Sequence, residues 1–411
     1  MAITRRRAAL LGAALLTVAA LLAAGVVLWR DPYNMVRADY LRARLSAGLR
    51  GGTVQAAGHR WAYAYSNKAP ENAPVIVMLH GYTGSKENWY PLAQRLRGQY
   101  RMIIPDLPGW GDSQRIAGAD YGYLAQAERV SQFIAALSPD RPVVLLGHSM
   151  GGGIAAVLAA EHPEQIARVG LFAASGVRFK DNQFGIDVLA GKNPFGVRDS
   201  ASMQRYLKTV FHDPQAQPWI PWPASDIFIA RRRSDSAFEQ SVLDRIGRSK
   251  QRFAPGEAAA AIDQPALLLW CQQDQVIDAS AMTLYGERMP QAMQVLLDGC
   301  GHMSLTEQPD LAAAAVQALI ERGQPRELEP ISESLHEPRL WPKPDASKAR
   351  DAGRNQRYEP RSALPRAPVL AQTRTGRGFA GEFGASSLHQ DGQSWHQPLP
   401  WPSPAIPASR P

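Results

Sequence analysis

The stretch PVVLLGHSMGGGIAAVLAA, residues 142–160, decides the fold that we predict for this chain. It begins with a run of β-branched and apolar residues, typical of a strand buried on both faces, and ends in an alanine-rich segment of helical composition. Gly147 and Gly151 flank the junction, and Ser149 lies between them. A serine on so sharp a turn needs small residues two positions before and after it, because a Cβ there would collide with neighbouring backbone. The stretch therefore predicts a strand, a tight turn that carries Ser149, and a helix.

This turn favours Ser149 as a nucleophile. The following helix would point its N-terminus at Ser149, so free N–H groups and the positive end of the helix dipole would face a developing oxyanion. The alternative is a chance Gly-x-Ser-x-Gly match in a chain with 34 glycines. The strand before the motif and the helix after it favour the catalytic interpretation.

The composition limits the classes of partner. The chain has 411 residues, a length that suggests two or three domains. Of these residues 45% are hydrophobic, which is enough for a large core. The net charge is +8, but residues 1–50 carry +6 and residues 324–411 carry +3, which leaves about −1 for residues 51–323. A nucleic-acid partner would need a basic face on the folded domain, so we expect none.

Two cysteines, Cys271 and Cys300, lie on what should be neighbouring strands. They could pair in an oxidising compartment, but we expect two free, buried thiols.

The N-terminal segment predicts a membrane anchor over residues 1–30. Residues 8–29 contain no charge for 22 positions and follow Arg5, Arg6 and Arg7. A helix of that length is about 33 Å long, enough to cross a bilayer, whereas the apolar part of a signal peptide has about 7 to 15 residues. A cleavage site at residues 23–25 and a twin-arginine-like signal at residues 4–7 remain as alternatives, which would make the protein secreted or periplasmic. The arginines before the span favour a cytoplasmic N-terminus (inner membrane, if the source is bacterial), but the arginines after it weaken that orientation.

Residues 31–50 predict an amphipathic juxtamembrane segment. Apolar side chains recur at steps of three to four residues from 33 to 49, with Arg37, Arg42 and Arg44 among them. A helix on the membrane surface and a helix packed on the domain are both compatible with this pattern.

Residues 51–323 alternate between strand and helix patterns. Besides the strand that leads to Ser149, strands are predicted at 60–66, 74–80, 101–105, 168–173, 266–271 and 293–297, and helices at 85–96, 121–137, 279–289 and 308–322. This alternation predicts an α/β fold with a mostly parallel sheet, helices on both of its faces, and a ligand site at the carboxyl ends of the strands.

Two segments break the alternation. Residues 177–260 are rich in aromatic and apolar side chains with several helical segments, and predict an inserted helical cap over the strand ends. Residues 324–411 hold 14 of the 32 prolines without any apolar period, and predict a disordered tail rich in proline and arginine. Residues 398–407 could form a polyproline ligand for an unknown protein partner, but we expect an inert tail.

Ser149 needs a general base, and the base needs a third group to set its tautomer. In folds of this type the acid and then the histidine follow the serine, each at a strand end. Asp274 and His302 lie just past the strands at 266–271 and 293–297. Asp278 is the rival acid, but it precedes a predicted helix and is better interpreted as its N-cap.

The second half of an oxyanion hole is expected from the loop at residues 80–85. We assign the backbone N–H groups of Tyr82 and Met150 to it. Gly81 and His80 support this loop, and we expect His80 to hold the loop by hydrogen bonds rather than to transfer a proton.

These residues together resemble the α/β-hydrolase fold superfamily: His80-Gly81, residues 106–113, Gly147 to Gly151, Asp274 and Gly301-His302. Within it, residues 270–278, the Gly-Cys-Gly-His before Met303, and residues 181–184 resemble the membrane-anchored monoacylglycerol lipase branch. Two features depart from that pattern. Cys271 stands where the family usually has glycine, and the proline-rich tail has no counterpart.

The resemblance implies a serine carboxylic ester hydrolase that acts on lipid or other hydrophobic esters through an acyl-enzyme, without a metal or cofactor. A carbon–carbon bond hydrolase or a peptidase would use the same triad. A membrane-tethered scaffold is the third class, and it would normally have lost part of the triad.

Overall fold

A computed structural model describes residues 2–66 and 68–321 of the chain. The tail predicted at residues 324–411 lies outside the described residues.

Eight strands form one sheet in the order β1-β2-β4-β3-β5-β6-β7-β8. β1 pairs with β2 and β2 with β4 in antiparallel fashion, and every later pairing is parallel. The mostly parallel sheet confirms the predicted fold class. The strands are β1 (Leu49–Ala56), β2 (His59–Ser66), β3 (Val75–Leu79), β4 (Arg101–Pro105), β5 (Val143–His148), β6 (Ile166–Phe172), β7 (Ala266–Cys271) and β8 (Met293–Leu297).

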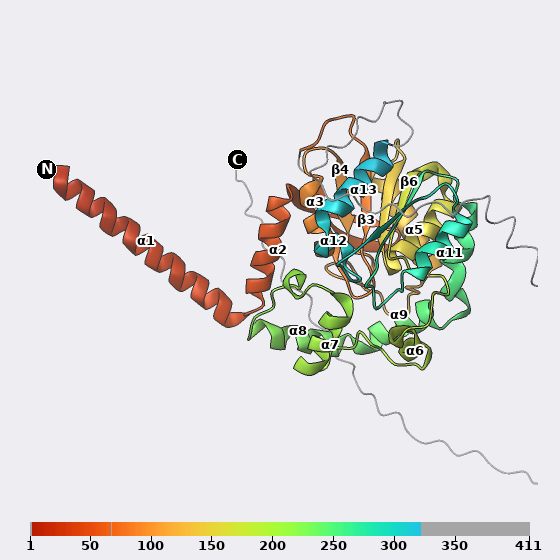
Figure 1. Cartoon of the computed structure of the whole chain (residues 1–411). Helices are drawn as coiled ribbons and strands as arrows, with labels where there is room; N and C mark the ends of the chain where they lie inside the picture. Colours follow the sequence, from red (N-terminus) through yellow and green to blue (C-terminus); the bar gives the residue numbers. More distant parts are fainter. Residues whose placement is uncertain (1, 67, 322–411) are drawn as a thin grey trace, which may run out of the picture. The chain divides into compact units, whose positions relative to one another are not determined.

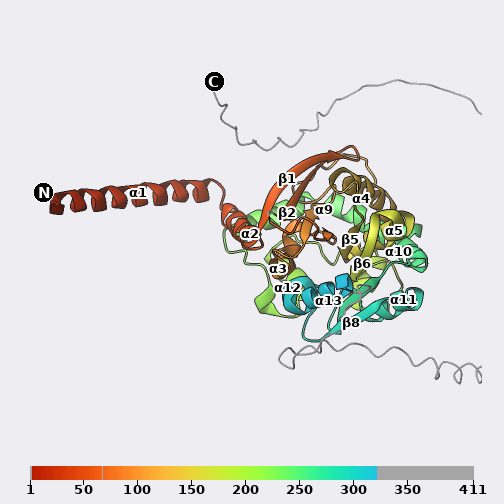
Figure 2. The ribbon, with the colours of Figure 1, turned by 90° about the horizontal axis from the view of Figure 1, so that it is seen from above.

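Helices cover both faces of this sheet (Figures 1 and 2). One group is α4 (Tyr123–Leu137), α5 (Met150–Glu161), α10 (Ala254–Ala258) and α11 (Ser280–Arg288). The other is α3 (Tyr90–Arg95), α12 (Ser304–Glu307) and α13 (Pro309–Glu321). All residues of β3, β5 and β7 are buried, as expected for parallel strands covered on both sides.

The sequence patterns did not predict β1. Its sequence, LRGGTVQA, lacks a clear apolar alternation and contains Gly51 and Gly52, which weaken a strand pattern. The strand forms because all eight residues pair with β2 across a tight turn. An added Cβ on Gly52 would lie 2.8 Å from the Tyr63 ring, so the partner strand leaves no room for a side chain there.

The N-terminal part forms two helices, α1 (Ala2–Arg30) and α2 (Asn34–Ser46). Residues Gly12–Arg30 of α1 are long and apolar enough to cross a membrane, with a mean hydropathy of 2.2. α2 packs on the domain beside β1, α3 and α8 (Ala224–Ser234), and its Val36 is buried. The guanidinium of Arg231 in α8 lies 4.1 Å from the Tyr33 ring that precedes α2. The outward face of α2 exposes Leu41 and Leu45, and contact of this face with a membrane stays a prediction.

Between β6 and β7 the chain forms a helical insertion, which we call the cap. Besides α8 and the short α10 it contains α6 (Gln183–Leu189), α7 (Ser200–Val210) and α9 (Ser236–Gly247), and α6 to α9 gather at one end of the sheet (Figure 1). A buried ion pair holds α8 to α9, with 2.6 Å between Arg232 Nε and Glu239 Oε1. The pairing satisfies both charges where water is excluded.

Candidate active site

Ser149 lies on the sharp turn between β5 and α5, in a strained backbone conformation with φ 54° and ψ −118°. The neighbouring glycines make this turn possible. A Cβ on Gly147 would lie 2.2 Å from the carbonyl oxygen of Gly151, and a Cβ on Gly151 would lie 2.4 Å from that of Leu79. Real Cβ atoms do not approach backbone so closely, so both positions require glycine in this arrangement. Ser149 directly precedes α5, and the first N–H groups of this helix, beginning with Met150, have no acceptor within the helix.

Asp274 and His302 meet at the carboxyl ends of β7 and β8. Oδ2 of Asp274 lies 2.8 Å from Nδ1 of His302, and both side chains are buried. The other oxygen, Oδ1, accepts the backbone N–H groups of Val276 and Ile277 at 2.8 and 2.9 Å. The carboxylate is therefore held in one orientation, and its bond to Nδ1 leaves Nε2 of His302 without a proton when the ring is neutral.

Asp278, the rival acid, has a different contact. Its Oδ1 accepts the N–H of Ser280 at 2.9 Å, the first residue of α11. That bond satisfies one of the free N–H groups at the start of the helix.

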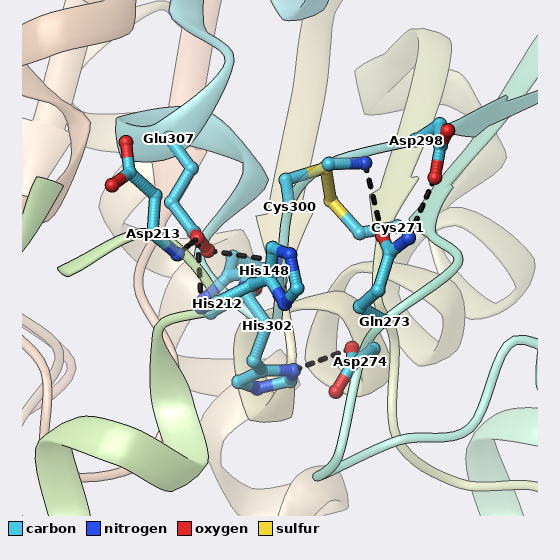
Figure 3. Close-up of a disulfide and its surroundings, with 12 residues drawn as sticks. His148, His212, Asp213, Cys271, Gln273, Asp274, Asp298, Cys300, His302 and Glu307 are labelled. Carbon is cyan, nitrogen blue, oxygen red and sulfur yellow. Dashed lines mark hydrogen bonds and ion pairs between the residues drawn. A yellow bond between two sulfur atoms is a disulfide. The ribbon is translucent and has the colours of Figure 1, made fainter. Parts of the chain in front are cut away.

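A disulfide between Cys271 and Cys300 corrects our expectation of two free thiols. Cys271 ends β7 and Cys300 lies two residues before His302, and their Cα atoms are 5.3 Å apart (Figure 3). The sequence placed both cysteines at neighbouring strand ends, but the distance between them depends on the path of the loop after β8. The disulfide joins the loop that carries Asp274 to the loop that carries His302.

Gln273 also connects these two loops, and His148 connects the end of β5 to the loop of His302. Gln273 donates to Asp298 Oδ1 at 2.6 Å and accepts the N–H of Gly299 at 3.0 Å (Figure 3). Nε2 of His148, the residue before Ser149, donates to the carbonyl oxygen of His302 at 2.8 Å. Burial, with a contribution from His302, lowers the pKa of His148 well below its usual value, so its ring stays neutral. The residue before Ser149 is therefore hydrogen-bonded to the backbone of His302, whose side chain pairs with Asp274.

The loop after β3 lies against the serine. A Cβ on Gly81 would lie 3.0 Å from Cβ of Ser149, so glycine lets this loop approach closely. His80 holds the loop in place: its Nε2 accepts the N–H of Leu107 at 2.9 Å, and its Nδ1 donates to the Gly81 carbonyl at 2.8 Å. Burial lowers the pKa of His80 to about 4, which keeps the ring neutral and able to make both bonds.

Tyr82 connects this loop to the cap. Its hydroxyl donates to the carbonyl oxygen of Glu239 in α9 at 2.7 Å and accepts from Asn193 at 3.2 Å. At the start of the cap, the Asn182 side chain donates to the carbonyl oxygens of Gln275 and Val276, beside Asp274. The cap is thus tied to the loops on both sides of the serine.

A pocket of about 200 Å³ opens between the cap and the sheet. Tyr82, Ser149 and Met150 are among the residues that line it. Apolar side chains from the cap dominate the rest, among them Phe179, Phe184, Val188, Leu243, Ile246 and Phe253. Two arginines, Arg178 and Arg252, also border the pocket. Such a lining suits an apolar chain whose reacting group reaches Ser149.

Glu307 is a site residue that sequence reasoning missed. It lies five residues after His302 and accepts the N–H of Gly301 at 2.9 Å. A carboxylate shortly after the histidine was the available signal, but its other partners, the N–H groups of His212 and Asp213, come from the cap, whose position the sequence does not give. Within residues 2–66 and 68–321, no group of three or more His, Cys, Asp or Glu side chains is arranged to hold a metal ion.

Residues 74–309 match the family described as "alpha/beta hydrolase fold". The chain belongs to this family. Monoacylglycerol lipase ABHD6 of Rattus norvegicus is 25% identical over 306 residues, which cover 71% of this chain and 88% of that protein. Lipase 3 of Moraxella sp. (strain TA144) is 27% identical over 270 residues, covering 66% and 83%. These relatives confirm the predicted resemblance to the monoacylglycerol lipase branch.

Among solved structures, a membrane phospholipase A described as a bacterial virulence factor is 33% identical, with a TM-score of 0.66. The match covers 75% of this chain and 97% of that one. A putative lipase of Acinetobacter baumannii AYE has a TM-score of 0.63 at 24% identity, which supports the fold alone. Together the relatives support a hydrolase that acts on lipid esters.

Proposed function

We propose that this α/β-hydrolase is a membrane-anchored serine hydrolase that cleaves carboxylic esters of lipids, as a monoacylglycerol lipase does. The observation that carries the proposal is the position of Ser149. It lies on a strained turn and lines a mostly apolar pocket, and its neighbour His148 is hydrogen-bonded to the backbone of His302, which pairs with Asp274.

The reaction begins when Oγ of Ser149 attacks the acyl carbonyl carbon while Nε2 of His302 accepts the hydroxyl proton. Asp274 holds Nδ1 and stabilises the resulting imidazolium. The N–H groups of Tyr82 and Met150 stabilise the tetrahedral oxyanion, a contribution of about 3 to 4 kcal/mol per donor. Collapse of this intermediate breaks the ester C–O bond, and His302 returns the proton to the departing alcohol. Water then attacks the acyl carbon while His302 accepts its proton, the bond to Oγ of Ser149 breaks, and His302 returns the proton to Ser149 as the fatty acid leaves.

A phospholipid ester is the second candidate substrate, because two guanidinium groups, those of Arg178 and Arg252, border the pocket against one carboxylate, that of Asp181. A guanidinium suits a phosphate oxygen geometrically and electrostatically. The similarity to a membrane phospholipase A supports this candidate. Arg178→Gln separates the two: it should lower activity on a lysophospholipid more than on a monoacylglycerol of the same acyl chain.

The membrane part of the proposal depends on α1 as a single-span anchor. Its residues Gly12–Arg30 are sufficiently long and apolar. The disulfide supports a catalytic domain outside the cytosol, because the cytosol keeps thiols reduced. The mature N-terminus of the purified protein tests this assignment, since a start near Gly25 would replace the anchor with a cleaved signal.

The test of the proposed chemistry is covalent labelling by a fluorophosphonate. The native protein should be labelled and should hydrolyse monoacylglycerols and p-nitrophenyl esters, whereas Ser149→Ala should lose both properties and keep its thermal stability. Labelling that survives in Ser149→Ala would disprove the mechanism. If the protein cleaves no ester but cleaves a carbon–carbon bond of a diketone, or a peptide bond, the result would favour a carbon–carbon bond hydrolase or a peptidase.

A further inference from the structure

Glu307, the last residue of α12, joins two segments that lie far apart in the sequence. Its Oε1 accepts the N–H of Gly301 at 2.9 Å, and its Oε2 accepts the N–H groups of His212 and Asp213, each at 2.8 Å (Figure 3). Gly301 directly precedes His302. His212 and Asp213 follow α7 in the cap. One carboxylate therefore connects the histidine loop to the cap.

The two segments are also in direct backbone contact. The N–H of His302 donates to the carbonyl oxygen of Val210, the last residue of α7, at 2.9 Å. A Cβ on Gly301 would lie 2.7 Å from the nitrogen of His212, so the histidine loop has no spare room against the cap. The disulfide and His148 hold the loop from the side of the sheet. Glu307 and Val210 hold it from the side of the cap.

A carboxylate suits this place better than its amide. An ionised carboxylate only accepts hydrogen bonds and can take the three N–H donors on its two oxygens. A glutamine has one accepting oxygen and an NH₂ group that donates. In Glu307→Gln the side-chain NH₂ would face the N–H of Gly301 or the N–H groups of His212 and Asp213. Two donors cannot form a hydrogen bond, so the hydrogen bonds on one side of residue 307 must break.

We propose that Glu307 is a positioning residue that couples the cap to His302. By holding the end of α7 and the histidine loop together, it keeps the imidazole aligned with Ser149 while the cap shapes the pocket. The inference rests on the proposed function, because it assigns Glu307 a role in the reaction of the same site. Glu307 does not border the pocket, so its effect should fall on turnover rather than on substrate binding.

The test compares Glu307→Gln with Asp310→Asn in the full chain, with p-nitrophenyl butyrate as substrate. Asp310 offers the matched carboxylate-to-amide control, because it lies nearby at the start of α13 and pairs with Arg95 at the surface. A misplacement of about 1 Å in an active site can cost roughly 10²-fold in rate. We expect kcat of Glu307→Gln to fall by roughly 10- to 100-fold with KM within about twofold, and Asp310→Asn to match the native enzyme.

A second variant separates positioning from folding. Gly301→Ala forces the histidine loop away from His212 with the carboxylate intact, and should lower kcat in the same way. Both changes break the same connection between the histidine loop and the cap. The fold-decrease in kcat of the double variant should therefore be smaller than the product of the two single fold-decreases. Native kcat in either folded single variant would overturn the proposal, as would a fully multiplicative loss. If Glu307→Gln does not fold, kcat of Gly301→Ala alone tests the proposal: a lower kcat supports it and a native kcat overturns it.

The proposed function fails in a distinguishable way. Absence of fluorophosphonate labelling in the native protein, or labelling retained in Ser149→Ala, contradicts the serine mechanism itself. A labelled, active native enzyme whose kcat is unchanged by Glu307→Gln contradicts the positioning role alone.

Discussion

Two aspartates follow β7 within seven residues, and their hydrogen bonds assign them different roles. Asp274 bonds to His302 and to two backbone N–H groups, whereas Asp278 bonds to the start of α11. The same residue type therefore contacts the proposed base at one position and the start of a helix at the other. The two aspartates differ in their distance from the end of β7. Asp274 comes first and contacts the loop after β8, which carries His302.

Asp274→Asn should lower kcat by about 10⁴-fold, because an amide in this place favours the wrong tautomer of His302. Asp278→Asn should change kcat little and lower stability by about 1 kcal/mol at most. Steady-state rates on a soluble ester measure both. The opposite ranking would show that Asp278 is the acid.

The buried His80 predicts a loss of stability in mild acid. Its pKa is about 4 in the folded protein against about 6.5 in an unfolded chain. Between these values the unfolded state takes up a proton that the folded state refuses, so stability is complete above about pH 6.5 and falls as the pH falls. His80 alone should lower the free energy of unfolding by about 2 kcal/mol between pH 7 and pH 5. His148 acts in the same direction.

Urea unfolding at pH 7 and pH 5, followed by tryptophan fluorescence, measures this effect. Burial raises the pKa of Asp106 and Glu87, which opposes the trend, so the whole-protein change alone does not isolate one histidine. His80→Asn should be less stable than the native protein at pH 7 but show a smaller further loss at pH 5. An unchanged pH dependence in this variant would argue against a neutral, buried His80.

At the scale of elements, the disulfide is the covalent connection between the two loops that bear Asp274 and His302. The cysteines are 29 residues apart in sequence. By loop-closure entropy, a link of that length stabilises the fold by about 3 to 4 kcal/mol. Because the linked loops also carry the proposed acid, Asp274, and the proposed base, His302, loss of the disulfide should affect catalysis as well as stability.

Reduction of the native protein should therefore lower both its Tm and its kcat. Tm and ester turnover before and after treatment with a phosphine reductant measure the two effects. The double variant Cys271→Ser with Cys300→Ser should resemble the reduced protein and should not respond to the reductant. Equal kcat in the oxidised and reduced forms would limit the disulfide to a role in stability.

At the scale of the whole molecule, membrane attachment and catalysis should be separable. Every residue proposed for the chemistry lies in the domain after α2, so deletion of residues 1–30 should give an at least partly soluble enzyme that still hydrolyses short esters. Two features of the remaining protein suit a lipid surface. α2 carries Arg37, Arg42 and Arg44, and the cap loop before α8 exposes Trp219 and Trp222 by 58% and 78%.

Co-sedimentation of the truncated protein with vesicles tests this separation. Binding should be weak, stronger to anionic than to neutral vesicles, and reduced by salt. Trp219→Ala with Trp222→Ala should weaken it further if the cap loop inserts into the interface. Complete release at low salt would leave α1 as the sole membrane contact among the described elements.

Local sequence patterns determine much of the fold and of the candidate site. The apolar runs of β3, β5 and β7, the glycines around Ser149, and the positions of Asp274 and His302 after their strands are all properties of short stretches of chain. They can be recognised in the sequence because buried parallel strands and tight turns constrain the residues that form them. β1 is the exception among the strands, since its pairing with β2 compensates for a weak strand pattern.

The remaining features depend on distances between segments that sequence spacing does not give. Cys271 and Cys300 pair because the loop after β8 folds back to the end of β7, and a sequence with two cysteines is compatible with either state. The roles of Tyr82 and Glu307 in holding the cap arise only where α7 and α9 meet the loops of the sheet. These contacts form when the insertion packs over the strand ends, and that packing is set by the summed burial of many side chains rather than by any single motif.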